Sequence, residues 1–180
     1  MRLRRVAGAV AAVVVAAAGA VALIAFFSGR DSAPVSSTPA GPGQVFPDQG
    51  AARLAPGQRP PQPYNSTPPT SGPHAPVPVT RDGTVLSDDQ LLTALAAGNV
   101  VLFYPMTRPP AALRTLADDE AGPFDPPLAA TGQAVILARR PGSPGVVAAA
   151  WRRLLRTASP TDPALKQFVE VWLGIGRRGK

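Results

Sequence analysis

The stretch 86–104, LSDDQLLTALAAGNVVLFY, decides the fold because it contains both ends of a helix and a strand directly after it. Ser87 and Gln90 have the spacing of a capping box, in which each side chain bonds to the other residue's backbone N–H. Two aspartates follow the cap, where the positive end of the helix dipole favours negative charge. Gly98 supplies the left-handed position at which helices commonly end. The sequence therefore predicts a helix over residues 88–97.

Strands and a second helix are predicted around this stretch. Val100–Tyr104 is an all-apolar run, which is typical of a strand buried on both faces, and residues 133–138 repeat the pattern. Pro109 and Pro110 precede apolar residues at helical spacing and predict a helix start. We expect this helix to fray at its acidic end, residues 118–120, because negative charge is unfavourable there.

The C-terminal part contains one ambiguous segment and one clear helix. The periodicity of residues 146–155 favours a helix slightly over a strand. Thr161 or Asp162 can cap a helix that has Pro163 near its first position and an apolar face, and Gly174 lies just beyond its end. Together the elements predict a small α/β or α+β domain with layered packing.

A long apolar run, Val6–Phe27, lies near the N-terminus and contains no charged or polar side chain. A helix of this length reaches roughly 33 Å and can cross a hydrocarbon core of about 30 Å. Three arginines precede it and only Arg30 follows, which places residues 1–5 in the cytoplasm. A cleaved signal peptide is the alternative, although its apolar region is usually only about 7–15 residues. We expect a single-pass protein of the cell membrane whose C-terminal domain lies outside.

The segment after the apolar run, residues 28–62, is rich in proline, glycine and serine. Its few large apolar residues cannot offset the entropy of ordering it, so the sequence predicts a disordered, extended linker. Large apolar residues return at regular spacing from about Val77. We expect one globular domain over residues 63–176, followed by a basic tail at 177–180.

Charge, cysteine content and missing motifs argue against several functions, beginning with nucleic-acid binding. The net charge is +7 and the pI about 11.2, but the basic clusters are not interleaved with aromatic residues in a nucleic-acid-binding pattern. We expect these clusters to form a solvated face, and contact with an anionic envelope polymer, an envelope protein or lipid is the alternative. The chain has no cysteine, which removes disulfides and thiol catalysis. A nucleophile elbow and a complete P-loop are also missing from the sequence.

The motif 68–74, PPTSGPH, contains the only histidine of the chain. Its prolines restrict the backbone and Gly72 permits a tight turn, so the imidazole of His74 is suited to holding a metal, a proton or an anion in a defined orientation. One imidazole does not make a metal site, and no other strong ligand lies nearby in the sequence. Two interpretations stay open: a structural histidine, and a metal site completed by residues distant in sequence.

The chain resembles the bacterial membrane-associated family known as domain of unknown function 3105, over about Tyr64 to Gly174. The resemblance rests on the motif 68–74 and on weaker matches: Tyr64, residues 91–104, Ala150-Trp151 and the helix around Phe168. It implies one membrane helix, a proline-rich stalk and an exported domain, and it favours a strand over residues 146–155. The candidate site residues are Tyr64, Pro69, Ser71, Gly72, His74, Thr93 and Tyr104.

This chain departs from the family's pattern at one place. Family members carry His-x-Leu-Glu-His-Gly where the capped helix ends, whereas residues 93–98 read TALAAG. We expect the helix face with Thr93, Ala96 and Ala97 to lie near His74, without other ligand side chains around the imidazole. The hypothesis is a non-catalytic, membrane-anchored binding or envelope-associated domain without a cofactor. The alternative is a metal-binding protein that uses His74.

Overall fold

The computed structural model describes residues 41–177. The predicted membrane span Val6–Phe27 lies outside these residues, as do residues 1–5, which we expect in the cytoplasm, and the last three residues. Among the helices of the described part, none has the length and apolar character needed to cross a membrane.

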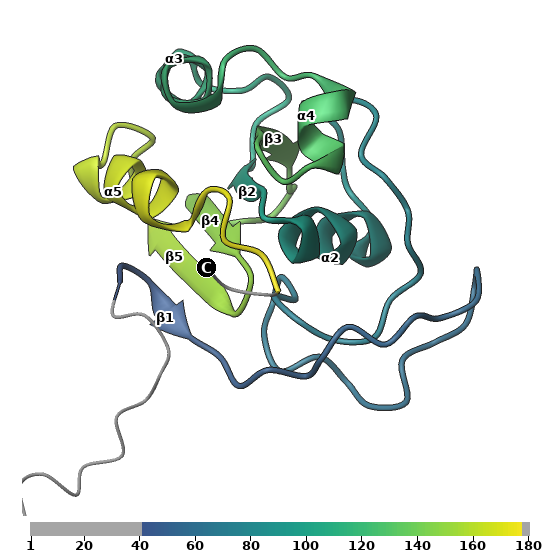
Figure 1. Cartoon of the computed structure of the whole chain (residues 1–180). Helices are drawn as coiled ribbons and strands as arrows, with labels where there is room; N and C mark the ends of the chain where they lie inside the picture. The colour runs from purple at the N-terminus through teal and green to yellow at the C-terminus, as the bar shows by residue number, and fades with distance from the viewer. Residues whose placement is uncertain (1–40, 178–180) are drawn as a thin grey trace, which may run out of the picture. The chain divides into compact units, whose positions relative to one another are not determined.

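A five-stranded sheet with the order β1-β5-β4-β2-β3 lies at the centre of the domain (Figure 1). Strands β2 and β3 are parallel, and the other neighbouring pairs are antiparallel. The strands are β1 (Gln44–Val45), β2 (Val100–Tyr104), β3 (Val135–Arg139), β4 (Val146–Ala150) and β5 (Arg153–Thr157). The helices are α2 (Asp88–Ala97), α3 (Ala111–Ala121), α4 (Pro126–Ala130) and α5 (Pro163–Trp172). This is a mixed α+β domain, as the sequence predicted.

The central strands are apolar throughout because both faces of the sheet are covered. Val101 and Phe103 of β2 contribute to the core that includes α2, whereas Leu102 and Tyr104 contribute to the core that includes α3 and α5. All five residues of β2 are buried. Alternation along the strand therefore places successive side chains in two different cores.

The predicted helix 88–97 is confirmed with both of its ends. The Gln90 amide N–H donates to Ser87 Oγ at 3.2 Å, and the Ser87 amide N–H donates to Gln90 Oε1 at 3.0 Å, which is the capping box. Gly98 ends the helix with a φ of 124°. Local chemistry thus sets both ends of this element.

Asn99 connects three elements from one buried position, with 1% of its surface exposed. Its Nδ2 donates to the carbonyl oxygens of Ala94 in α2, at 3.0 Å, and Ala129 in α4, at 2.7 Å. Its Oδ1 accepts from the Ala134 N–H at 2.9 Å, directly before β3. One side chain therefore fixes the ends of two helices and the start of a strand.

The segment 146–155 is a strand hairpin, as the family resemblance implied and contrary to the helical periodicity. Strands β4 and β5 pair through five residue pairs, and Trp151 and Arg152 form the turn. Arg152, the second residue of the turn, has a φ of 64° and is therefore in the left-handed conformation. Pairing across the hairpin outweighs the weak helical stripe because it satisfies the backbone in a buried layer.

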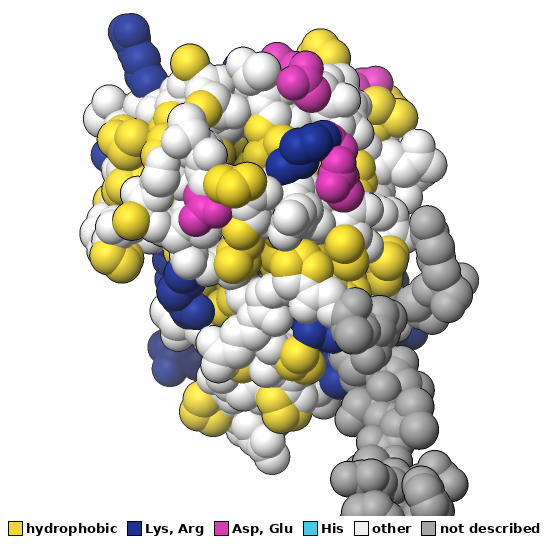
Figure 2. Space-filling view, turned by 90° about the vertical axis from the view of Figure 1, so that its left-hand side faces the viewer, with side chains coloured by type: hydrophobic (Ala, Val, Ile, Leu, Met, Phe, Trp, Pro, Cys, Tyr) yellow, Lys and Arg dark blue, Asp and Glu magenta, His cyan; other side chains and the backbone are white. Residues whose placement is uncertain are grey.

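The expected fraying of α3 is wrong, because the helix runs through its acidic end to Ala121. Lys166 of α5 supplies the missing compensation: its Nζ forms an ion pair with Glu120 and a second one with Glu170 at 2.9 Å. Acidic side chains gather at the top of the face shown in Figure 2, on the side of the molecule that carries α3. Helix α5 itself follows the prediction, with Asp162 as its N-cap.

The expectation of a disordered linker up to residue 62 is corrected for residues 41–62, which we call the arm. The arm begins beside α5, where Trp172 Nε1 donates to the Pro42 carbonyl at 2.9 Å. It then adds β1 to the sheet and buries Leu54. The arm is ordered by backbone pairing with distant segments, which its composition does not reveal. Residues 28–40 lie outside the described part.

We expect Asn99→Ala to lower the free energy of unfolding by about 3 kcal/mol, because it removes three buried hydrogen bonds to backbone groups of three elements. Asn65→Ala is the control, since Asn65 is exposed and donates one side-chain bond to Pro47, and it should cost less than about 1 kcal/mol. Urea unfolding followed by the fluorescence of the two tryptophans measures both. Equal effects of the two variants would contradict the role of Asn99.

Candidate functional site

The PPTSGPH motif is a loop held against the arm. Ser71 Oγ accepts from the Gln49 amide at 3.0 Å, and the Gly72 amide donates to the Gly50 carbonyl at 2.7 Å. Tyr64 lies over Gly72, where an added Cβ would come within 2.6 Å of its ring. The Tyr64 hydroxyl donates to the Pro73 carbonyl at 2.8 Å. Glycine at position 72 is therefore required by close packing as well as by its φ of 137°.

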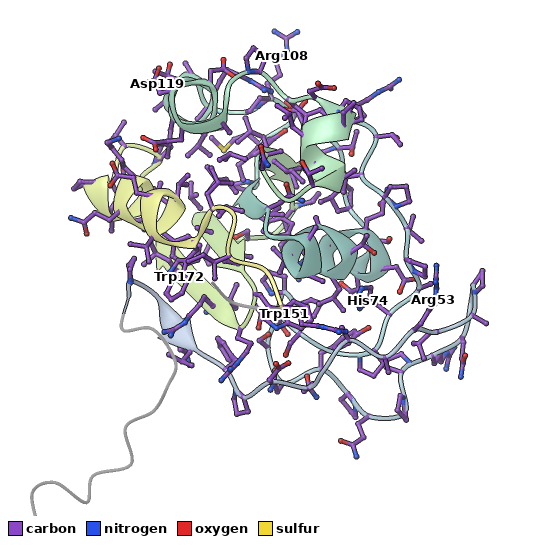
Figure 3. The ribbon with its side chains drawn as sticks, in the orientation of Figure 1. Arg53, His74, Arg108, Asp119, Trp151 and Trp172 are labelled. Atoms are coloured by element: carbon purple, nitrogen blue, oxygen red, sulfur yellow. The ribbon has the colours of Figure 1, made fainter. Side chains whose placement is uncertain are left out.

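His74 is buried, with 8% of its surface exposed. Its backbone N–H donates to the Ala52 carbonyl of the arm, and its carbonyl accepts from the Leu54 N–H. Its Nδ1 lies 2.8 Å from the Gly72 carbonyl oxygen. Because a carbonyl only accepts, Nδ1 carries the proton and Nε2 is the nitrogen available to a ligand. The described residues supply no hydrogen-bond partner for Nε2. Figure 3 shows His74 beside α2, on the same side of the helix as Arg53 of the arm.

One face of α2 holds the chain that follows His74. Asp89 Oδ1 accepts from the Ala75 amide at 2.9 Å. Thr93 Oγ1 accepts from the Val77 amide at 3.1 Å and donates to the Ala75 carbonyl at 3.3 Å. Both side chains are thereby occupied in positioning residues 75–77 against the helix, and this fixes where His74 stands relative to α2.

A cavity of about 550 Å³ lies where His74 meets the C-terminal end of α2, and we call it the His74 cavity. Its described lining residues are Ala51, His74, Ala96, Ala97, Gly174, Gly176 and Arg177. The expected proximity of Ala96 and Ala97 to His74 is therefore present. Thr93 instead lines a smaller cavity of about 100 Å³, which Ala97 also borders.

Residues 174–177, which we call the tail, form one wall of the His74 cavity by running across the end of α2. The Gly174 amide donates to the Gly98 carbonyl at 2.9 Å, and the Arg177 amide donates to the Ala96 carbonyl at 3.1 Å. A Cβ at Gly176 would come within 2.4 Å of the Ala96 oxygen. The tail thus satisfies helix carbonyls that would otherwise be left without partners.

Gly132 approaches the same helix end from another side. A Cβ at this position would come within 2.1 Å of the Ala97 carbonyl oxygen. The end of α2 is therefore surrounded by backbone at glycine positions. This close packing keeps large side chains away from that helix end.

The cavity offers few groups for chemistry. His74 and Arg177 are its only titratable side chains among the described lining residues, and the others are alanine and glycine. Across residues 41–177, no cluster of three or more histidine, cysteine or acidic side chains is placed to hold a metal ion. The arrangement can bind a ligand through an imidazole nitrogen and a guanidinium group, but it brings no second acid or base to the imidazole.

The structure separates the candidate residues of the sequence analysis. Tyr64, Ser71, Gly72 and His74 lie together, and Pro69 is buried in the same loop. Burial raises the pKa of the Tyr64 hydroxyl, and the charges of Asp88 and Asp89 raise it further. The hydroxyl therefore stays protonated as the donor to Pro73.

Tyr104 does not belong to this group, because its side chain lies in the core on the other face of the sheet. Its hydroxyl donates to the Gly83 carbonyl at 3.3 Å. Burial raises its pKa, and Asp82 adds to the shift. Tyr104 has a packing role in the described structure.

The role of the tail, residues 174–177, as a wall of the cavity was not predicted from the sequence. The sequence analysis placed Gly174 at the end of the last helix and Arg177 in a basic C-terminal segment, residues 177–180. The spacing of Gly174 and Gly176 was the available signal, since alternate glycines after a helix permit close backbone approach. Ala51 was missed because the arm was expected to be disordered.

These features define a small α+β domain. Among the described cavities, the His74 cavity is the one whose lining includes a histidine. The family model described as "Protein of unknown function (DUF3105)" matches residues 58–175, which is more than half of the chain. The chain belongs to this family, as the PPTSGPH motif indicated. No curated protein and no solved structure matches the chain.

We expect Gly132→Ala to destabilise the domain more than Gly142→Ala, by about 1–3 kcal/mol, because of overpacking against the Ala97 carbonyl. The two glycines have φ values of 79° and 80°, so both variants bear the same left-handed backbone strain. A Cβ at Gly142 meets nothing within 4 Å. Urea unfolding compares the two, and equal midpoints would show that the end of α2 tolerates the added atom.

Proposed function

We propose that this protein is a non-catalytic binding domain displayed on the outer side of the cell membrane, and that the His74 cavity is its binding site. The observation that carries the proposal is the cavity itself. Its volume of about 550 Å³ lies within the usual range for small-ligand sites, about 300–1,000 Å³. Its lining combines small side chains with one imidazole and one guanidinium, which suits recognition of a small polar ligand.

The surrounding hydroxyl and carboxyl groups support binding over catalysis. Nucleophilic or acid–base catalysis needs a nucleophile beside a base, or paired carboxylates. Ser71 Oγ bonds to the arm, Thr93 Oγ1 bonds to residues 75 and 77, and Asp89 bonds to Ala75. These groups hold the structure together and leave His74 without a catalytic partner on the described lining.

The binding proposal predicts saturable chemical-shift changes at Ala96, Ala97 and Gly174 when the full chain in detergent is titrated with a panel of small molecules. The panel contains neutral, cationic and anionic compounds and Zn²⁺, and amide NMR spectra report which class binds. We expect the compounds to remain chemically unchanged. Conversion of a compound that His74→Ala abolishes would contradict the non-catalytic proposal, as would a panel in which nothing binds.

The same panel tests the metal-binding alternative. Within the described residues His74 Nε2 is the one strong ligand on the cavity lining. A single imidazole binds divalent zinc weakly compared with sites of three or four ligands. Stoichiometric Zn²⁺ in the full chain that disappears in His74→Ala would therefore favour the metal-binding alternative.

The membrane location is supported by the sequence of residues 1–27. We expect a reporter that is active only outside the cytoplasm to function when fused after Lys180, because the arginines before Val6 hold the N-terminus inside. The full-length protein should resist carbonate extraction. Deletion of Val6–Phe27 is the control and should abolish reporter activity. A mature N-terminus within residues 18–31 would instead make this a secreted protein.

A further inference from the structure

We propose that the ligand of the His74 cavity is a small oxyanion, a carboxylate or a phosphate group, held between the His74 imidazole and the Arg177 guanidinium. This inference rests on the proposed binding function and names its ligand class. It follows from the charges on the cavity lining, from the orientation of the imidazole and from the packing at the end of α2.

The ionisable lining groups of the described cavity are basic. Arg177 carries a permanent positive charge, and the described lining contains no carboxylate. Asp89 lies on the adjoining helix face but accepts a bond from the Ala75 amide and is not part of the lining. An anion therefore meets an attractive charge and no repelling carboxylate, whereas a cation meets Arg177.

The imidazole presents one defined nitrogen to the cavity ligand. Nδ1 donates to the Gly72 carbonyl, so the ligand can engage only Nε2. A protonated imidazole donates from Nε2 to an oxyanion, and a neutral imidazole accepts there from an O–H group. Hydrogen phosphate carries both O⁻ and O–H, so it suits either form. A carboxylate offers acceptors alone and requires the protonated form.

The end of helix α2 opposes an anion only weakly. Its dipole corresponds to about half a negative charge, which is smaller than the full charge of Arg177. The carbonyl oxygens of Ala96 and Gly98 already accept bonds from amides of the tail. The Arg177 backbone bonds at this helix end, where a positive charge is favourable.

Two variants separate the ligand contacts from structural roles. Arg177→Ala removes the guanidinium of an exposed residue and leaves the backbone N–H that bonds to Ala96. His74→Asn removes Nε2, while its amide Nδ2 is placed to donate to the Gly72 carbonyl as Nδ1 does. Arg59→Ala is the matched control, since Arg59 is also exposed and lies outside the described lining.

The experiment titrates the full chain in detergent with inorganic phosphate, with acetate, with methylammonium and with ethylene glycol, and follows the amide signals of Ala96, Ala97 and Gly174. We expect saturable shifts with phosphate or acetate. Arg177→Ala and His74→Asn should each weaken this binding by about tenfold or more, the loss of one charge-assisted hydrogen bond. Arg59→Ala should leave it unchanged.

The arms of the titration separate the ligand sources and the two proposals. Tighter binding of phosphate than of acetate would identify a phosphate group, and tighter binding of acetate than of phosphate would identify a carboxylate. Binding of only methylammonium or ethylene glycol would overturn the oxyanion proposal and leave the binding function intact. Equal weakening of binding by Arg59→Ala and Arg177→Ala would also overturn the oxyanion proposal, because the loss would then come from the lower net charge of the protein and not from a contact in the cavity.

Discussion

The buried side chain of Asn99 is the constraint on which the arrangement of this domain depends. It binds the carbonyl oxygens of Ala94 and Ala129 and the amide of Ala134, so it joins α2, α4 and β3 at one point. An amide is the side chain that offers two donors and an acceptor without charge. These three bonds replace the partners that two helix ends and a strand start would otherwise find in water. The end of α2 is therefore fixed to α4 and β3 by one buried side chain.

Fixing that helix end has consequences for the cavity. Because Gly132 and the tail approach the end of α2 through backbone atoms, the space beside Ala96 and Ala97 is bounded by small residues. On the other side, Asp89 and Thr93 hold residues 75–77 and so set the position of His74. The walls of the cavity are held by hydrogen bonds, and apart from His74 and Arg177 the described lining residues are alanine and glycine.

The sequence predicts the elements that depend on local chemistry. The capping box sets α2, Asp162 sets the start of α5, and the apolar run Val100–Tyr104 sets the central strand. Elements held by distant partners could not be predicted. The arm looks disordered by composition, yet its backbone pairs with β5 and with the loop of His74. His74 could be predicted because it belongs to a local sequence motif. Ala51 and Arg177, which complete the cavity, could not, because distant parts of the chain bring them there.

Residues 93–98, TALAAG, stand where the family resemblance implies His-x-Leu-Glu-His-Gly, and they have different surroundings in the structure. Thr93 is engaged with residues 75 and 77, so its hydroxyl serves the structure. Ala96 and Ala97 instead border the His74 cavity, where larger polar side chains would occupy the space. Replacing such side chains by alanine removes both the volume and the charge that they would bring next to His74. What remains is a cavity whose described lining carries one imidazole and one guanidinium, and the binding function that we propose rests on this lining.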